Sequence, residues 1–269
     1  MSHSADIQSP LATVISPRCH ISERPLRGAA LTRMSAEILV ESDVAGVVKK
    51  LSSIIGDNAN ETIEREGIFK IGLSGGSLVK FLSEGLPTVT TDWSKWRFFF
   101  CDERIVPFDN EESTYGLYKA SLIGKLPITE SQFVTVDPEL SAEEAAKDYI
   151  KKMSVYFPPH SLPRFDVLLL GMGPDGHTCS LFPGHRLLEE TSLWVGPIND
   201  SPKPPPSRIT LTFPVINNAR ACIFAIAGAG KAEMVKRIWG SKEKLPAGLV
   251  QPTDGTLFLI LDKEAAEKL

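Results

Sequence analysis

The sequence has few cysteines, and none is placed where a thiol would have an obvious chemical role. Its 269 residues include only Cys19, Cys101, Cys179 and Cys222, and no pair has Cys-x-x-Cys spacing. Three of the four lie beside or within apolar runs, which favours reduced, buried thiols over a disulfide framework. The five histidines also lack tight ligand spacing with one another or with a cysteine. We therefore expect neither a bound metal nor a cofactor that needs one.

Long apolar stretches and long basic runs are missing as well. No segment of 18 apolar residues is present, so we expect no contact with a membrane. The net charge is -4 and the pI is about 5.8, which makes nucleic acid a poor candidate partner. An anionic ligand would have to be held by a local basic pocket rather than by the field of the whole protein.

The first 36 residues lack the apolar periodicity of the rest of the chain. They are rich in Ser, Pro, Arg and Ala, and their arginines outnumber their acidic residues. A transit peptide has a related composition, but the two prolines of SPRCHISERP argue against a single amphipathic helix. We expect residues 1–36 to be a disordered extension and residues 37–269 to form one α/β domain.

Helical and extended patterns alternate from residue 41 onwards. We expect helices at 44–55, 78–86, 113–126, 141–157 and 231–240, and strands at 68–73, 97–103, 133–136, 164–173, 194–198, 208–213, 221–228 and 256–262. This alternation predicts an α/β fold: a doubly wound, mostly parallel sheet with helices on both faces, similar to a Rossmann fold. In such sheets ligands bind at the carboxyl ends of the strands.

The first junction of interest is Ser74-Gly75-Gly76-Ser77, between an expected strand and an expected helix. Glycines let the backbone approach an anion, and the free N–H groups of a helix start favour phosphate. The alternative is a tight turn in which a serine caps the helix.

The second junction is Asp102-Glu103-Arg104, at the end of an apolar strand. Arg104 could form a bidentate contact with a phosphate. It could also simply pair with one of the two neighbouring carboxylates.

The third junction, Gly171 to His177, has the spacing GxGxxG. A dinucleotide fingerprint opens a long helix, but HTCSLFPGH does not have a long amphipathic pattern, so this interpretation is disfavoured. His177 follows a Gly-rich loop at a strand end, where it could act as a general base near neutral pH. Asp175 could assist it or only cap the following turn.

The fourth junction contributes two cations, Arg208 after the connector SPKPPPS and Lys231 after Gly228-Ala229-Gly230. Either could be an ordinary surface charge. The case for a site rests on four separate junctions that each offer groups compatible with a sugar phosphate.

Together, the segments GLSGGS, CDERIVPFDNEESTYGLY, LLGMGPDGHTCSLFP, NDSPKPPPSRITLT and GAGKAE resemble the 6-phosphogluconolactonase family of the glucosamine/galactosamine-6-phosphate isomerase superfamily, over about residues 38–262. The resemblance implies a cytoplasmic, cofactor-free hydrolase that converts 6-phospho-D-glucono-1,5-lactone to 6-phosphogluconate in the oxidative pentose phosphate pathway. It implies that His177 and Asp175 are catalytic. It implies substrate-binding roles for Ser74, Gly75, Gly76, Ser77, Asp102, Arg104, Arg208 and Lys231. We further expect a monomer.

Two alternatives share this fold. Glucosamine-6-phosphate deaminases also have a strand-end Asp-Gly-His, but they typically carry a further glutamate shortly after it, and residues 178–183 contain no acid. A sugar-phosphate sensor would need an output domain, and residues 1–36 are too short and irregular to form a DNA-binding module.

Overall fold

The computed structural model describes residues 36–269. The expected disordered extension over residues 1–36 lies, apart from Ala36, outside the described residues. Within the described part, no helix is long and apolar enough to cross a bilayer.

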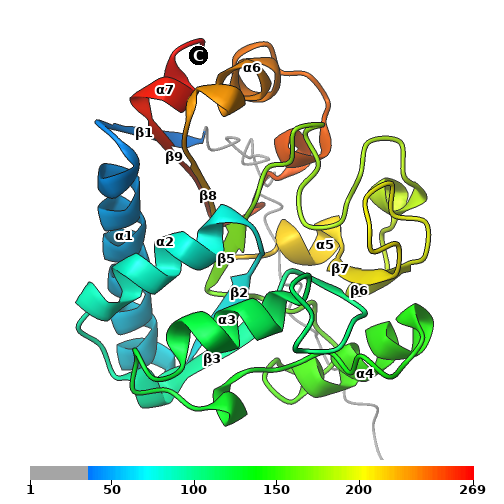
Figure 1. Cartoon of the computed structure of the whole chain (residues 1–269). Coiled ribbons are helices and arrows are strands. Elements are labelled where there is room, and N and C mark those ends of the chain that lie inside the picture. The colour runs from blue at the N-terminus through cyan, green and yellow to red at the C-terminus, as the bar shows by residue number, and fades with distance from the viewer. Residues whose placement is uncertain (1–35) are drawn as a thin grey trace, which may run out of the picture. The chain divides into compact units, whose positions relative to one another are not determined.

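A parallel sheet of six strands forms the centre of the described region (Figure 1). Its strands are β1 (Glu37–Glu41), β2 (Phe69–Leu73), β3 (Trp96–Phe100), β5 (Val167–Leu170), β8 (Ala221–Ile226) and β9 (Thr256–Asp262). They lie in the order β1-β9-β8-β5-β2-β3, and every neighbouring pair is parallel. The sheet is flanked by helices, so the predicted α/β class is confirmed. The edge strand β1 was not among the expected strands.

A second sheet consists of three antiparallel strands and is joined to the first at Cys101. It contains β4 (Asp102–Arg104), β6 (Val195–Ile198) and β7 (Arg208–Leu211), in the order β4-β7-β6. The strand expected at 97–103 is therefore two strands in different sheets. Cys101 joins them, because its N–H donates to Leu73 O at 2.8 Å and its carbonyl accepts from Leu211 N at 2.7 Å.

The described residues form seven α-helices in addition to the strands. They are α1 (Val44–Glu66), α2 (Ser77–Gly85), α3 (Thr114–Leu122), α4 (Ala142–Ser154), α5 (Phe213–Ile216), α6 (Ala232–Val235) and α7 (Lys263–Ala266). Local sequence explains their ends. The Asp43 side chain caps α1 by accepting from Gly46 N, and Gly67 ends that helix in the left-handed region at φ 75°. At the start of α4, Ser141 and Glu144 form the expected capping box.

Two expected elements differ from the structure. Residues 133–136 form no strand, because only Phe133 makes an isolated bridge, to Phe98. The helix expected at 231–240 is a short α6 followed by a π-helical segment, Lys236–Gly240. In both places the apolar pattern correctly indicates burial. The hydrogen-bond pattern, however, depends on neighbouring segments that the local sequence does not specify.

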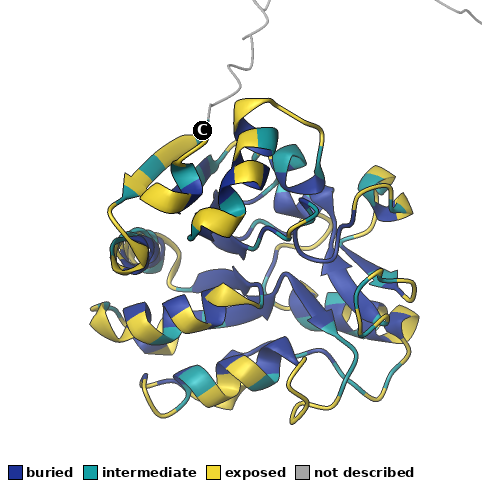
Figure 2. Ribbon diagram, turned by 45° about the horizontal axis from the view of Figure 1, so that its top comes forward, coloured by how far each residue is buried: buried dark blue, intermediate teal, exposed yellow. Residues whose placement is uncertain are grey.

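The core lies between the sheets and the inner faces of the helices. Figure 2 shows the central strands almost wholly buried, while the edge strand β1 is exposed and the longer helices alternate buried and exposed faces. All five residues of β2 and all four of β5 are buried, which fits a parallel sheet covered on both sides. The carboxyl ends of these buried strands carry the polar junctions described below.

Candidate active site

The junctions singled out from the sequence meet around one pocket of about 200 Å³. Eight of the ten expected site residues line it: Ser74, Gly75, Gly76, Ser77, Asp102, Arg104, His177 and Lys231. Gly171, Met172, Gly173 and Cys179 complete the wall. Asp175 and Arg208 are not among the lining residues. The pocket thus lies at the carboxyl ends of β2, β5 and β8, as the parallel topology predicts.

The start of α2 presents free donors to this pocket. Gly76, at φ 73°, occupies the N-cap position, and no side chain caps the helix. The serine cap considered from the sequence is therefore not formed. The hydroxyl of Ser74 is buried and has no hydrogen-bond partner within residues 36–269. Uncapped backbone N–H groups and an unpaired buried hydroxyl are groups that an anion can satisfy.

His177 and Asp175 form a short hydrogen-bonded pair beside the pocket. Asp175 Oδ1 lies 2.5 Å from His177 Nδ1. A charged Asp175 accepts a hydrogen bond from Nδ1–H, which fixes the tautomer whose Nε2 carries the lone pair. Nε2 makes no hydrogen bond to any other described residue. The arrangement therefore provides an oriented imidazole with one basic nitrogen free.

Glycines in the loop after β5 make room for this imidazole. A Cβ on Gly173 would collide with the His177 ring, and Gly176 adopts φ 81°. The loop closes on itself through hydrogen bonds from Gly173 N to His177 O and from Gly176 N to Gly173 O. No helix follows directly, since the next helical turn begins at Arg186. The GxGxxG spacing thus serves a tight turn and not a dinucleotide site.

The surroundings of the pair lower the pKa of both its members. Burial lowers the pKa of His177 and outweighs the opposing effect of the Asp175 carboxylate. For Asp175, burial acts to raise the pKa, but the hydrogen bond and charge of His177 and the hydrogen bond from Lys203 lower it to about 2. A neutral imidazole beside a charged carboxylate is consequently the form near pH 7.

Lys203 is a member of the site that the sequence did not reveal. Its Nζ lies 3.1 Å from Asp175 Oδ1 and 3.2 Å from His177 Nδ1. The residue belongs to the proline-rich connector between β6 and β7, which we expected to be only a stiff link. The only sequence feature that could have indicated a role for Lys203 is its position among the prolines of a segment that carries the family resemblance.

At the second junction, Asp102 and Arg104 face the pocket, whereas Glu103 does not. Asp102 is buried and accepts a hydrogen bond from Ser180 Oγ at 2.7 Å. Arg104 pairs with the exposed Glu112 through Nη1, and its buried Nε has no partner in the described region. Arg104 therefore retains a free donor.

Glu103 anchors the start of α3. Its carboxylate accepts hydrogen bonds from the backbone N–H groups of Arg104, Thr114 and Tyr115 at 2.7–2.8 Å. Burial raises the pKa of Glu103 to about 7. The role of this residue is to position the helix behind the pocket.

The two remaining cations differ in exposure to the pocket. Lys231 lines it, and its Nζ donates to Met172 O at 2.8 Å, while burial, and then the charge of Lys203, lowers its pKa. Arg208 is 3% exposed and donates to the carbonyls of Lys203, Pro204 and Pro205. The structure thus places Arg208 behind the connector and not on the pocket wall, because β7 directs its side chain into the protein.

Within residues 36–269, no three His, Cys, Asp or Glu side chains are grouped so that they could hold a metal ion. The polar groups that surround the pocket are instead donors and cations, together with the His177–Asp175 pair.

Comparison with known proteins assigns a family. Residues 42–259 match the family model described as glucosamine-6-phosphate isomerases/6-phosphogluconolactonase. A 6-phosphogluconolactonase of Rattus norvegicus is 51% identical over 226 residues, which cover 81% of this chain and 88% of that protein. The Homo sapiens 6-phosphogluconolactonase is 55% identical over 208 residues, covering 75% of this chain and 81% of that one.

Solved structures agree with the sequence relatives. The 6-phosphogluconolactonase of Trypanosoma brucei superposes with a TM-score of 0.76 and 27% identity, covering 87% of this chain and 99% of that one. The similarity therefore extends over most of this chain.

Proposed function

The chain belongs to the glucosamine-6-phosphate isomerase/6-phosphogluconolactonase family, and from that membership we propose that it hydrolyses 6-phospho-D-glucono-1,5-lactone to 6-phosphogluconate. The high identity to curated lactonases supports a carboxylic-ester hydrolase. The observation that carries the mechanism is the His177–Asp175 pair at the same pocket as the cations and the start of α2. The proposal includes a cytoplasmic, monomeric enzyme of the oxidative pentose phosphate pathway.

His177 is the general base in this proposal. Nε2 takes a proton from water while the water oxygen bonds to C1 of the lactone, which gives a tetrahedral intermediate. When the intermediate collapses, the bond between C1 and the ring oxygen breaks, and the imidazolium returns the proton to that oxygen. Asp175 holds the ring in the required tautomer and stabilises the transient imidazolium. Lys203 holds the Asp175 carboxylate through the same oxygen, Oδ1.

The substrate phosphate binds between the start of α2, Arg104 and Lys231. The free N–H groups of α2, the unpaired Ser74 hydroxyl and the unpaired Arg104 Nε are the donors that favour a dianion here. Arg208 contributes at a distance: its hydrogen bonds to three connector carbonyls hold the segment that carries Lys203. We therefore assign Arg208 a positioning role in place of direct phosphate contact.

The runner-up reaction is deamination of glucosamine 6-phosphate, which the family description also covers. The described site has no carboxylate in the six residues after His177. A coupled assay with both substrates separates the reactions: we expect lactone turnover above the spontaneous rate and no ammonia release from glucosamine 6-phosphate.

Replacing the base tests the mechanism. His177→Ala should lower kcat by about 10²–10⁴-fold and leave substrate affinity largely unchanged, the usual range for a lost general base. His185→Ala is the matched control, since His185 also pairs with an aspartate, Asp200, but away from the pocket lining. Near-normal kcat in His177→Ala would exclude His177 as the base.

The phosphate assignment of Lys231 can be tested with a double cycle of enzyme and substrate. Lys231→Ala should lower kcat/KM for the phosphorylated lactone by roughly 10–150-fold, the value of one hydrogen bond to a charged group. It should hardly affect unphosphorylated glucono-δ-lactone, which lacks the partner of that lysine. Lys236→Ala removes an exposed charge one turn away and serves as the control. Equal slowing of both lactones would assign Lys231 to structure or to the reacting carbonyl.

A further inference from the structure

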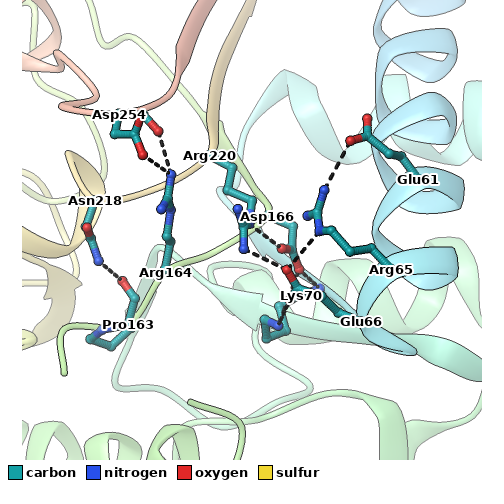
Figure 3. A network of polar contacts seen from close by, with 10 residues as sticks. All are labelled: Glu61, Arg65, Glu66, Lys70, Pro163, Arg164, Asp166, Asn218, Arg220 and Asp254. Atoms are coloured by element: carbon teal, nitrogen blue, oxygen red, sulfur yellow. Dashed lines mark hydrogen bonds and ion pairs between the residues drawn. The ribbon is translucent and has the colours of Figure 1, made fainter. Parts of the chain in front are cut away.

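A second and larger cavity, of about 340 Å³, lies at the opposite edge of the parallel sheet (Figure 3). Its walls come from the last turn of α1 and from the segments that lead into β5, β8 and β9. Those are the amino ends of the strands, whereas the active site occupies the carboxyl ends. Three arginines line the cavity: Arg65, Arg164 and Arg220.

Ion pairs join the residues behind the cavity into a network. Arg220 contacts Glu66 at 2.6 Å and the buried Asp166 at 3.3 Å, and Lys70 lies 3.5 Å and 3.7 Å from the same two carboxylates. Arg65 also belongs to this network, because its Nε lies 3.2 Å from Glu66. This network ties together α1 and the starts of β2, β5 and β8, which accounts for its presence without a ligand.

The outer wall is different, because its acidic partners are loosely held. Arg65 pairs with Glu61 at 3.1 Å, and Arg164 pairs with Asp254 at 2.9 Å. The side chains of Glu61 and Asp254 are 75% and 89% exposed. Exposed ion pairs contribute only about 0–1 kcal/mol, so a better anion can displace these carboxylates.

Arg164 also has an unsatisfied donor. Its Nε is buried and has no hydrogen-bond partner in the described region, although its Nη2 donates to the Asp254 carbonyl at 2.6 Å and to the Asp254 carboxylate. Buried unpaired donors are uncommon in native proteins and call for a partner. An anion on the cavity side could accept from Nε while it replaces the Asp254 carboxylate.

We propose that this cavity is a second anion-binding site, for inorganic phosphate or a small phosphate monoester, separate from the substrate pocket. Arg65, Arg164 and Arg220 line the cavity together with Glu61 and Asp254, whose displacement would leave the guanidinium groups facing the anion, and Thr62 and Thr256 add hydroxyls. The donors come from four segments on different sides. A tetrahedral phosphate, with acceptor oxygens in several directions and bidentate affinity for arginine, suits that arrangement better than a planar carboxylate.

Equilibrium dialysis of labelled inorganic phosphate at low ionic strength tests the proposal on the full chain. The measurement is made in a Lys231→Ala variant, because this substitution reduces phosphate binding at the substrate pocket. In that background, Arg164→Gln should weaken the remaining phosphate binding by about 10-fold or more. Asp254→Asn should strengthen it, because the competing carboxylate is removed.

Arg237→Gln is the matched control, since Arg237 also pairs with an exposed acid, Glu243, but lines neither cavity. It should leave phosphate affinity unchanged. A parallel titration with glycerol 3-phosphate shows whether the free ion or the monoester binds more tightly.

Equal phosphate affinity in Arg164→Gln and Arg237→Gln would overturn the proposal and leave an ion-pair network with no ligand. Failure of Asp254→Asn to tighten binding would do the same. Because Asp254 is highly exposed, its substitution keeps the test valid even where Arg164→Gln lowers stability.

Discussion

At the scale of single residues, opposing influences act on the pKa of His177. Asp175 favours the protonated imidazole, while burial and the adjacent Lys203 ammonium favour the neutral one. Neutral histidine is the form that can accept a proton from water. The net lowering of its pKa therefore keeps the base active at and somewhat below neutral pH.

Lys203→Met should move the acidic limb of the kcat/KM pH profile to higher pH. Removal of the cation makes the imidazolium easier to form, so the pKa of His177 rises and less neutral base remains at a given low pH. Lys203→Arg, which retains the charge, should keep the limb close to that of the wild type. A limb that stays in place or moves to lower pH in Lys203→Met would show that Lys203 does not tune the base.

Lys203 and Arg208 show which features of a site a local sequence pattern can and cannot specify. His177 and Lys231 could be predicted, because each directly follows a strand whose end faces the ligand edge. Lys203 reaches His177 from a connector 26 residues further along the chain, and no strand end marked it. Arg208 begins a strand of the antiparallel sheet, and all four residues of that strand, Arg208 included, are buried.

At the scale of elements, α4 is tied to the end of β3 by one side chain. The hydroxyl of Tyr149 accepts from Phe100 N at 2.6 Å and donates to Phe100 O at 3.1 Å, and the ring is fully buried. Phe100 precedes Cys101, where the chain passes from one sheet to the other. Tyr149 therefore supports the bend that brings Asp102 and Arg104 to the pocket.

Tyr149→Phe should lower the free energy of unfolding by about 1–3 kcal/mol, since it leaves buried backbone groups unsatisfied. Urea unfolding measures the effect. Tyr156→Phe is the control, because the Tyr156 ring also packs on a core phenylalanine, Phe99, but its hydroxyl makes no hydrogen bond to the described chain. Equal stability of the two variants would contradict this account of the bend.

Most buried elements could be predicted, and the exceptions have a common cause. The strands β5, β8 and β9 appear as continuous apolar runs bounded by polar residues or glycine, and β2 as an apolar run interrupted by Lys70. The division at Cys101 has no such marker, because the three charged residues after it, which do not read as a strand, form β4. Pairing with Leu73 on one side and Leu211 on the other creates the division, and those partners are distant in sequence.

At the scale of the whole described region, β1 is an edge strand of the large sheet, because it pairs only with β9. It pairs with β9 in parallel from Glu37 to Glu41, and Leu39 packs against the core. All the residues that line the pocket in the described region come from the chain after β1.

Deletion of residues 1–35 should leave kcat and the melting temperature unchanged. Deletion of residues 1–41 should lower the melting temperature by several degrees, because β9 loses its partner and 1 kcal/mol corresponds to about 2–4 °C in a chain of this size. Differential scanning calorimetry of both variants gives the comparison. A large loss in the shorter deletion would show that the first 35 residues contribute to stability.

The free donors of the pocket connect activity to tolerance of mutation. Ser74 Oγ and Arg104 Nε are buried without partners in the described chain, and α2 starts without a side-chain cap. Such groups lower the stability of the unliganded protein, since each would be more favourable with an internal partner. Substitutions that give one of these donors a partner inside the protein would make the fold more robust and the binding of a phosphorylated ligand weaker. Stability and activity therefore make opposite demands on the pocket. Selection for heat resistance alone should yield stabilising substitutions there, whereas selection that also requires activity should not.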